Sequence, residues 1–245
     1  MTRPALLITG VSSGVGLSLA RHLAERFHVI GVARKLDVAR VALAGVSNLD
    51  LYAAELGNTE SVEACLDAVT DRHGHPAYLI NNAGVNLPAR VDALAPEVLA
   101  ASLQVNCLAP LAIMRRLLPS MVERGFGRII NVTSGAPLNC FPGYAAYSAS
   151  KAALNALTVT AAREHEGSNV RINLMSPGPV RSNMAPDAPM GPSACHPTVD
   201  YLLGPDPDLP TGRFFWLGHE IPLFPDLDGI RWLEGTAPER FRRVL

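Results

Sequence analysis

Residues 5–16, ALLITGVSSGVG, are the part of the sequence that says most about the fold. Its first five residues, Ala5 to Thr9, form a short apolar run of the kind found in buried strands. Glycines 10, 14 and 16 follow, and Leu19, Leu23 and Phe27 then recur at helical spacing. A strand, a glycine-rich turn and a helix in this order are typical of a dinucleotide-binding domain, because the turn lets backbone N–H groups approach a pyrophosphate.

The alternation of short apolar runs with longer periodic segments continues along the chain. Further strands are predicted at 28–32, 49–53, 78–81, 128–133, 170–176 and 213–217, and helices at 59–72, 96–124 and 144–166. The strands read as continuous apolar runs, which favours a parallel sheet covered on both sides. We therefore expect an α/β fold: a Rossmann-type, doubly wound parallel sheet of about seven strands with helices on both faces.

Composition narrows the class of protein. The chain has 245 residues, 48% of them hydrophobic, which suits a single domain at 1–222 followed by a tail at 223–245 containing an amphipathic helix. A net charge of −1 offers no basic surface for nucleic acid or an anionic membrane. No apolar run is expected to be long enough for a signal peptide or a transmembrane helix, and four widely spaced cysteines indicate a reduced, cytoplasmic protein.

The turn after the first strand predicts the cofactor site. Its backbone and the start of the next helix form an anion site from Gly10, Ser12, Ser13, Gly14, Val15 and Gly16. The same residues also match G-x-S-x-G, the nucleophile elbow of α/β-hydrolases. An elbow serine normally follows several strands and needs a later acid and histidine, whereas this one follows the first strand, so the hydrolase is the weaker interpretation.

Arg34 bears on which dinucleotide is bound. An enzyme for NAD is expected to carry an acidic residue at the end of the second strand, where it binds the ribose 2′-hydroxyl. Arg34 stands there instead. Since a guanidinium can bind a 2′-phosphate bidentately, NADP(H) is preferred over NAD(H). The alternative is a solvated surface arginine.

Tyr147 and Lys151 are the candidate proton-transfer pair. Four residues apart in a helical segment, they share one face, and the ammonium is expected to lower the pKa of the phenol. Tyr-x-x-x-Lys is also common on exposed helices, and Tyr144 is a weaker candidate two turns before the lysine. Ser134 follows the predicted strand 128–133 and can hydrogen-bond a reacting oxygen at the sheet edge where such folds bind ligands.

Two further segments are expected beside this site. Asn82, Ala83 and Gly84 end the fourth strand with residues that let a nucleotide ribose pass close by, although an ordinary turn would look the same. Pro110 lacks the N–H that would bond the carbonyl of Asn106, so a kink in the 96–124 helix is expected there.

Taken together, these motifs resemble the short-chain dehydrogenase/reductases of the classical type, over roughly residues 5 to 222. That family's pattern is TGxxxGxG, NNAG, an Asn, a Ser and YxxxK, in this order. The resemblance implies that Tyr147 is the catalytic acid/base, that Lys151 binds the nicotinamide ribose, and that Ser134 stabilises the substrate oxygen. Asn106 would anchor a water relay from Lys151.

The resemblance also implies further cofactor contacts. Pro177, Gly178, Val180 and Ser182 are similar to the family's PGxVxT, with Ser182 in place of Thr. Glu55 and Leu56 stand where the family has Asp-Val to hold the adenine. Residues 210–215, PTGRFF, and the later Ile221-Pro222 resemble the carbonyl-reductase-like branch, from which Arg213 and Leu223 depart.

The expected activity is NADPH-dependent reduction of a ketone or aldehyde, with Tyr147 as proton donor. Alternatives are an NAD(P)-dependent secondary alcohol dehydrogenase, a 3-oxoacyl-thioester reductase, or a catalytically silent nucleotide-sensing or scaffold protein. The proline-rich stretch at about 179–198 is either a lid over the pocket or a surface connection stiffened by proline. Largely apolar walls at 86–90, 136–142 and 184–190 favour a hydrophobic substrate. The family's usual assembly predicts a homodimer or homotetramer.

The remaining reactive residues carry no prediction of chemistry. The seven histidines show no HExxH spacing and no clustering with acids, so no metal is expected. Cys195 and His196 are adjacent, but sequence neighbours rarely point at each other, so a cysteine mechanism is disfavoured.

Overall fold

The computed structural model describes residues 3–225, 228–231, 233 and 238–241. Its sheet has eight strands in the order β3-β2-β1-β4-β5-β6-β7-β8, and every pair is parallel except β7 with β8. The strands are β1 (Ala5–Thr9), β2 (His28–Ala33), β3 (Leu49–Ala53), β4 (Tyr78–Asn81), β5 (Gly127–Val132), β6 (Val170–Ser176), β7 (Phe214–Trp216) and β8 (His219–Ile221).

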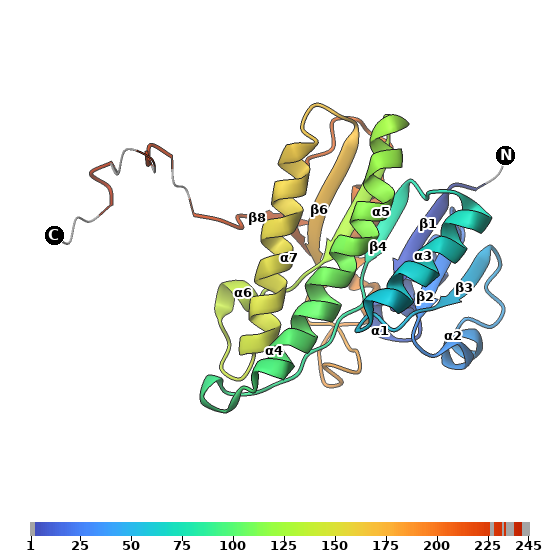
Figure 1. Ribbon diagram of the computed structural model, residues 1–245, viewed down its shortest axis with the longest axis horizontal. Coiled ribbons are helices and arrows are strands. Elements are labelled where there is room, and N and C mark those ends of the chain that lie inside the picture. The colour runs from blue at the N-terminus through green and yellow to red at the C-terminus, as the bar shows by residue number, and fades with distance from the viewer. Residues whose placement is uncertain (1–2, 226–227, 232, 234–237, 242–245) are drawn as a thin grey trace.

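Helices cover both faces of this sheet, and Figure 1 shows α3, α4, α5 and α7 on the near one. The helices are α1 (Gly14–Leu23), α2 (Leu36–Ala42), α3 (Thr59–His73), α4 (Pro96–Leu103), α5 (Ala109–Glu123), α6 (Ala136–Asn139), α7 (Ala145–Glu164) and α8 (His196–Leu202). Two 3₁₀ turns, η1 (Val91–Ala93) and η3 (Pro192–Cys195), and a π-helical turn, η2 (Gln104–Leu108), complete the described elements.

The core is split into two apolar layers by the sheet. Along β1, Leu6 and Ile8 pack against α1 on one face, while Leu7 points to the other face, towards α3 and α5. All three side chains are fully buried. Successive residues of a strand face opposite sides, so a strand that is apolar throughout must be covered on both. The doubly wound α/β fold expected from the sequence is thereby confirmed.

The strand order reverses between β1 and β4. The chain moves outward from β1 to β2 and β3, then returns to β4 on the other side of β1. In open sheets of this kind, the crevice at the carboxyl ends of the strands beside this reversal is where ligands bind. A ligand site is therefore expected at the carboxyl ends of β1, β4 and β5.

The sequence analysis missed three α-helices and one strand, all of them short. Helices α2, α6 and α8 have seven, four and seven residues, too few for an apolar period to be recognised. β8 has three residues and the burial pattern eei, so no apolar run marks it. Its antiparallel pairing with β7 raises the strand count to eight from the expected seven or so.

The expectation that no stretch is long enough to span a membrane is wrong by length. Pro96–Glu123 runs through 28 residues with a mean hydropathy of 1.5 in its most apolar window, of which 39% is buried. Ile113, Leu117 and Met121 from this stretch pack into the core layer against the sheet. It is therefore a core helix of this fold, interrupted by the π-helical turn where Pro110 was expected to disturb it.

The predicted tail helix gains no support. The described part of the tail, which comprises 223–225, 228–231, 233 and 238–241, contains no helix, and the rest of 223–245 lies outside the described residues.

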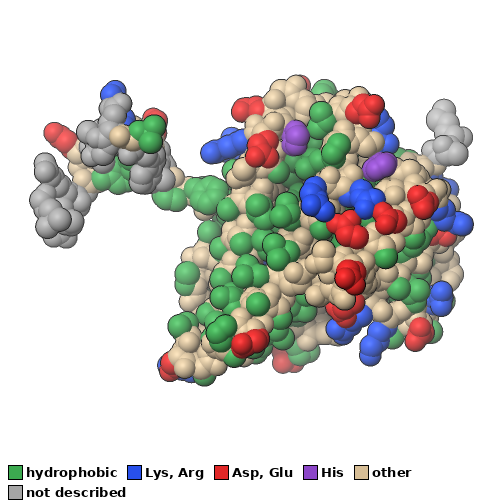
Figure 2. Space-filling model, in the orientation of Figure 1, with side chains coloured by type: hydrophobic (Ala, Val, Ile, Leu, Met, Phe, Trp, Pro, Cys, Tyr) green, Lys and Arg blue, Asp and Glu red, His purple; other side chains and the backbone are tan. Residues whose placement is uncertain are grey.

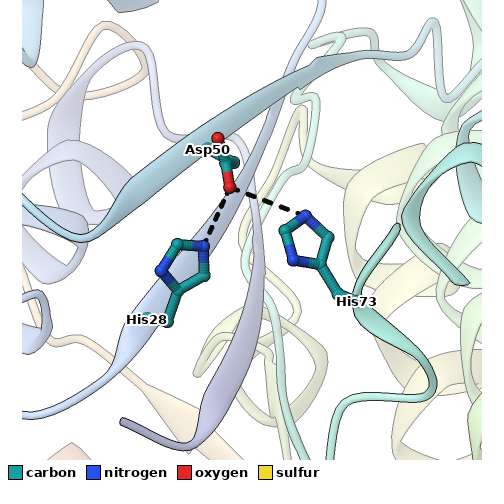
Figure 3. Close-up of side chains that lie close together, drawn as sticks. All are labelled: His28, Asp50 and His73. Carbon is teal, nitrogen blue, oxygen red and sulfur yellow. Dashed lines mark hydrogen bonds and ion pairs between the residues drawn. The ribbon is translucent and has the colours of Figure 1, made fainter. Parts of the chain in front are cut away.

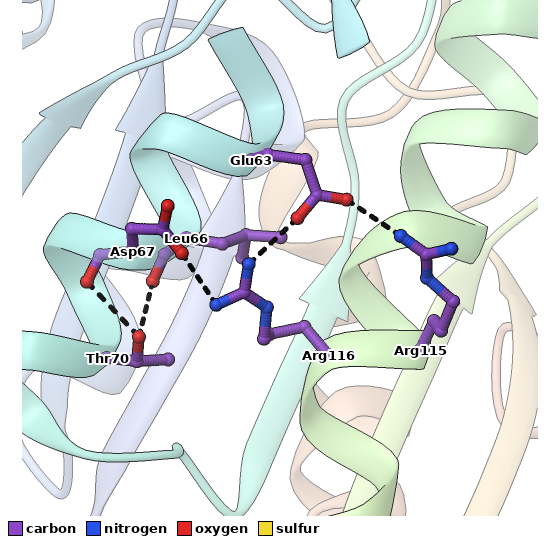
Figure 4. A network of polar contacts seen from close by, with 6 residues as sticks. All are labelled: Glu63, Leu66, Asp67, Thr70, Arg115 and Arg116. Carbon is purple, nitrogen blue, oxygen red and sulfur yellow. Dashed lines mark hydrogen bonds and ion pairs between the residues drawn. The ribbon is translucent and has the colours of Figure 1, made fainter. Parts of the chain in front are cut away.

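A polar network joins α3 to α5 on the surface (Figure 4). Arg116 contacts Glu63 at 2.9 Å and Asp67 at 2.7 Å, and Arg115 contacts the second oxygen of Glu63 at 3.0 Å. Exposed ion pairs contribute little singly, but this network links the two helices that cover the β1–β4 region of the sheet.

Arg128, in the middle of the sheet on β5, is completely buried. All five of its N–H donors are used on backbone carbonyls: those of Gly204, Gly127, Asn169, Pro205 and Asp206, at 2.7 to 3.1 Å. The guanidinium carbon also lies 4.3 Å from the centre of the Phe126 ring. A buried charge without a carboxylate is tolerated here because every donor is satisfied, and the turn at 204–206 is thereby attached to β5.

Candidate active site

A cavity of about 860 Å³ opens at the carboxyl ends of the strands. Nearly all the residues singled out in the sequence line it: Gly10, Ser12, Ser13, Gly14, Val15, Gly16, Arg34, Glu55, Leu56, Asn82, Ala83, Gly84, Ser134, Tyr147, Lys151, Pro177, Gly178, Val180 and Ser182. Asn106 is the exception, since it lies buried behind the wall. Segments from six strand ends or loops thus meet in one place, as the strand order requires.

The glycine turn between β1 and α1 has a steric cause. A Cβ on Gly16 would lie 2.2 Å from the carbonyl oxygen of Gly10 and 2.4 Å from Asn82 Nδ2. Gly10 itself has a φ of 77°, a conformation that side chains disfavour. The turn can therefore press against the end of β4 only with glycines at these positions.

The start of α1 is suited to an anion. Its N-cap residue, Ser13, makes no side-chain cap hydrogen bond, and the first turn has no acidic residue. The first N–H groups of a helix lack partners within the helix, and here they adjoin the cavity lined by Gly14 and Val15. The residues present thus fit a dinucleotide pyrophosphate.

The NNAG segment holds the end of β4 against the glycine turn. Thr9 Oγ1 accepts hydrogen bonds from the backbone N–H groups of Asn82 and Ala83, both at 3.0 Å. Asn82 Nδ2 donates to the carbonyl of Thr9 at 2.9 Å. Asn82 therefore stabilises the glycine turn. The sequence analysis predicted only a ribose contact here and not this structural role.

Ser134, Tyr147 and Lys151 converge on the same wall of the cavity. Ser134 follows β5, and Tyr147 and Lys151 lie one turn apart on α7. Tyr147 and the Ser134 side chain are hydrogen-bonded, an interaction that acts to lower the pKa of the phenol. Lys151 Nζ donates to the carbonyl of Val132 at 2.7 Å and lies 6.0 Å from the centre of the Tyr147 ring.

The expected effect of Lys151 on Tyr147 is wrong for the protein without ligand. Burial raises the pKa of Tyr147 above its usual value of 10, and the hydrogen bond with Ser134 only partly offsets this. Burial also lowers the pKa of Lys151 to about 8. Because the lysine is itself desolvated and bonded to Val132, its charge is not directed at the phenol oxygen. Tyr147 is therefore protonated at neutral pH.

Asn106 connects the wall to α7. Its Oδ1 accepts from the Val85 N–H and its Nδ2 donates to the Val85 carbonyl, both at 2.8 Å. Nδ2 also donates to Ser150 Oγ at 2.9 Å. A Cβ on Gly84 would lie 3.0 Å from Asn106 Oδ1 and 3.5 Å from Lys151 Nζ. Asn106 thus fixes the loop after β4 next to the lysine.

Arg34, at the end of β2, lies near an acidic side chain. Its Nη1 lies 3.7 Å from Glu55 Oε2, and both side chains are largely exposed. Glu55 Oε1 accepts from the Gly57 N–H at 3.2 Å, so the acid is oriented by its own turn. The cation and the anion therefore share one corner of the cavity.

The rest of the cavity lining, among the described residues, carries no charged side chain. Apart from the cofactor-side residues named above, the lining includes Val85, Asn86, Leu87, Pro88, Tyr144, Met184 and Ala185. Residues 136–142, expected as a third wall, are absent from the lining. Phe141 instead lies half-exposed with its ring 6.3 Å from that of Tyr144, whose ring in turn is 6.4 Å from that of Tyr147.

A buried polar row behind the site was missed. Thr133 Oγ1 donates to Asn155 Oδ1 at 2.6 Å, and Asn131 Nδ2 donates to Thr158 Oγ1 at 2.8 Å. The signal was present, since residues 151, 155 and 158 recur at helical spacing as polar residues on a helix that had to bury one face.

Cys195 and His196 do not form a reactive pair. Cys195 is fully buried, and burial raises the pKa of its thiol to about 11. His196 Nε2 contacts Ser18 Oγ at 2.9 Å instead.

The expectation that histidines do not cluster with acids is also wrong. His28 and His73 lie beside Asp50 at the far edge of the sheet (Figure 3).

Residues 4–191 match the short chain dehydrogenase family. Among curated proteins, the chain is 31% identical over 183 residues to 3-amino-tetrahydro-pyrrolizinone reductase of Xenorhabdus hominickii, covering 74% of this chain and 63% of that protein. It is 31% identical over 185 residues to D-beta-hydroxybutyrate dehydrogenase of Rhizobium meliloti, covering 73% and 71%.

A solved structure gives the same result. The chain superposes on 4-hydroxyisoleucine dehydrogenase complexed with NADH with a TM-score of 0.82 at 25% identity, covering 88% of this chain and 97% of that one. The match to the pyrrolizinone reductase spans less than two thirds of that protein's length. The family match, by contrast, includes the glycine turn, Ser134, Tyr147 and Lys151. The chain belongs to the short-chain dehydrogenase family.

Proposed function

We propose that the protein is an NADPH-dependent reductase of an uncharged, apolar ketone or aldehyde. The observation that carries this proposal is the convergence of the glycine turn, Ser134, Tyr147 and Lys151 on one cavity of about 860 Å³. A nucleotide-sensing or scaffold protein would have no chemical need for the three side chains at one end of its nucleotide site.

The residues divide the work of carbonyl reduction. The bound nicotinamide supplies the hydride. Tyr147, protonated at neutral pH because burial raises its pKa, donates the proton to the carbonyl oxygen. Ser134 and Tyr147 stabilise the developing negative charge on that oxygen through hydrogen bonds. Lys151 holds the nicotinamide ribose, and Asn106 maintains the loop after β4 beside it.

The preference for NADP(H) rests on Arg34. A 2′-phosphate near the end of β2 would meet a guanidinium and no acid on that strand. Glu55 opposes this preference, since its carboxylate lies 3.7 Å from the same guanidinium. Arg34→Ala should therefore lower the ratio of NADPH to NADH affinity by at least about tenfold, because hydrogen bonds to charged groups contribute about 1.5–3 kcal/mol. Glu55→Gln should raise that ratio.

The substrate side supports an uncharged compound. Leu87, Pro88, Tyr144, Met184 and Ala185 present apolar surface. The charged side chains that line the cavity in the described part of the chain are Arg34, Glu55 and Lys151, and all three are assigned to the cofactor. A carboxylate or phosphate on the substrate would have no cation left to pair with. The lid at about 179–198, within the proposed 1–222 domain, supplies Met184 and Ala185.

We also propose a homo-oligomer in the cytoplasm. Figure 2 shows hydrophobic side chains gathered over α4, α5 and α7, and Leu108, Leu111 and Val122 are between 37% and 46% exposed. A second copy of the chain would cover them. Sedimentation should give a dimer or tetramer that Leu111→Glu dissociates, and a monomeric wild-type protein would contradict this part.

Calorimetric titration with NADPH and with NADH tests the function. Tight NADPH binding and weaker NADH binding are expected, followed by NADPH consumption in the presence of neutral aromatic or aliphatic ketones. If the protein binds neither cofactor, the proposed enzymatic activity is wrong. Turnover confined to alcohols with NAD⁺, or to 3-oxoacyl thioesters, would replace the carbonyl reductase by one of those alternatives.

A further inference from the structure

The edge of the sheet opposite the cavity carries a second group of reactive side chains, shown in Figure 3. His28 is the first residue of β2, Asp50 is the second residue of β3, and His73 is the last residue of α3. Helices that follow parallel strands run back to the amino edge, so the end of α3 meets the starts of β2 and β3. His28 and Arg34 lie at opposite ends of β2, roughly 20 Å apart at the usual rise of a strand.

The three side chains aim their ligand atoms at one another. Asp50 Oδ2 is 2.9 Å from His28 Nε2 and 3.7 Å from His73 Nε2. One ligand atom from each residue lies within 4.8 Å of the other two. Around a tetrahedral Zn²⁺ with bonds of about 2.0–2.1 Å, ligand atoms are about 3.4 Å apart. Closing the widest gap therefore requires a movement of at most about 1.4 Å.

We propose that His28, Asp50 and His73 form a site for a divalent first-row transition ion, with Zn²⁺ as the ion to test. Two imidazole nitrogens and one carboxylate oxygen are ligands that suit such ions. The ion would join β2, β3 and α3 at the amino edge, independently of the proposed reductase activity.

The surroundings allow an ion to enter and leave coordination positions for water. The side chains of His28 and Asp50 are each 33% exposed, and that of His73 is 11% exposed. The ligands come from three elements that are otherwise held by the sheet and by packing, so their positions are set in advance of binding.

Two neighbours compete with the ion. Arg72 Nε lies 3.9 Å from Asp50 Oδ2, and the Tyr52 hydroxyl lies 2.9 Å from His73 Nε2. Binding must displace the Tyr52 hydrogen bond and work against the charge of Arg72. Arg72 is 68% exposed and free to turn outward. Arg72 therefore provides a test that separates a metal site from a merely hydrogen-bonded cluster. Arg72→Gln should tighten Zn²⁺ binding, because a positive charge that repels the ion is removed.

The full chain, stripped with a chelator, should be titrated with ZnCl₂ by calorimetry and against a chromogenic zinc chelator. We expect saturable binding of one ion. At free Zn²⁺ 100 times the dissociation constant, the folding equilibrium should shift about 100-fold towards the folded state in denaturant titrations. Absence of binding at millimolar Zn²⁺ would overturn the proposal.

Ligand variants locate the ion. His28→Gln and His73→Gln should each weaken Zn²⁺ binding by about tenfold or more. Loss of a hydrogen-bond partner of a metal ligand already costs about tenfold in affinity, and loss of the ligand itself should cost at least as much. Glutamine retains a hydrogen-bond donor towards Asp50, so both variants are expected to fold. Circular dichroism checks that they do. If either variant fails to fold, the other variant and Arg72→Gln decide the matter.

Two control variants guard against binding elsewhere. His219→Gln removes an exposed histidine of β8, and Cys140→Ser removes the exposed thiol. Both should bind Zn²⁺ as tightly as the wild type, and Co²⁺ should show no thiolate charge-transfer band. Unchanged binding in His28→Gln and His73→Gln, or loss of binding in either control, would place the ion elsewhere and overturn the proposal.

Discussion

The carboxyl and amino edges of the same sheet differ in how their functional groups are encoded. At the carboxyl edge, the groups lie in local motifs: a glycine turn within seven residues, and Tyr147 and Lys151 one helical turn apart. At the amino edge, His28, Asp50 and His73 lie 22 and 23 residues apart and meet only through the fold. Local motifs can be read from one sequence because helix and turn geometry convert spacing into proximity. Distant residues require the strand order and the return path of each helix.

The comparison predicts that catalysis depends on the carboxyl edge alone. Tyr147→Phe should lower turnover of a carbonyl substrate by about 100- to 10,000-fold, the usual contribution of a general acid. NADPH affinity should stay within a few-fold, since the phenol oxygen acts on the substrate. Steady-state kinetics and calorimetry measure the two effects. A variant that keeps most of its rate would show that another group donates the proton.

Gly16 in the turn after β1 should tolerate no side chain. Gly16→Ala places a Cβ 2.2 Å from the Gly10 carbonyl, so the turn must open. Overpacking of this kind costs about 1–3 kcal/mol of unfolding free energy, and the displaced turn should lose NADPH binding. Gly191→Ala is the matched control, because its Cβ would meet only ordinary contacts at 3.7 Å or more. Equal stability of the two variants would contradict the steric account of the turn.

The pH dependence should follow Lys151. Its pKa in the free protein is about 8, and it loses its charge as pH rises through that value. Tyr147, with a pKa above 10, remains protonated over the same range. The kcat/KM for reduction reports the free enzyme and should therefore decline above pH about 8. Lys151→Arg, which stays charged, should remove this decline in whatever activity it retains.

The smallest effect is expected at the amino edge. Tyr52→Phe removes one hydrogen bond, to His73, at a half-buried position. It should lower the unfolding free energy by about 0.5–1.5 kcal/mol, which is a few degrees in Tm. Turnover and NADPH affinity should match the wild type within error. A change in kcat of tenfold or more would show that the two edges are coupled.

Much of the carboxyl edge could be predicted from the sequence, and the reasons are physical. Strands β1, β3, β4 and β6 were predicted with the correct ends because buried parallel strands are rich in apolar residues. The lining of the cavity followed from the motifs and the strand order. The direction in which the pKa of Tyr147 shifts could not be predicted from the sequence. It depends on burial and on the group to which the Lys151 ammonium is hydrogen-bonded.

The misses have a common origin. α8 and β8 are too short for a periodic signal, and the metal-ligand cluster has no spacing signature. Residues 136–142 were assigned to the cavity by position in the chain, but Cys140 adopts a left-handed conformation at the end of α6, and the segment does not line the cavity. Such features are set by tertiary packing rather than by local pattern.

Arg128 has a consequence for how this protein can change. The chain leaves the sheet at the end of β6, passes through η3 and α8, and is fastened again at 204–206 by the guanidinium on β5. Within this segment, Cys195, Val199 and Leu202 pack into the core layer that contains Leu6 and Ile8. Substitutions that preserve the core are therefore confined to the part before Cys195, and the anchor at 204–206 separates them from β7 and its register on β6.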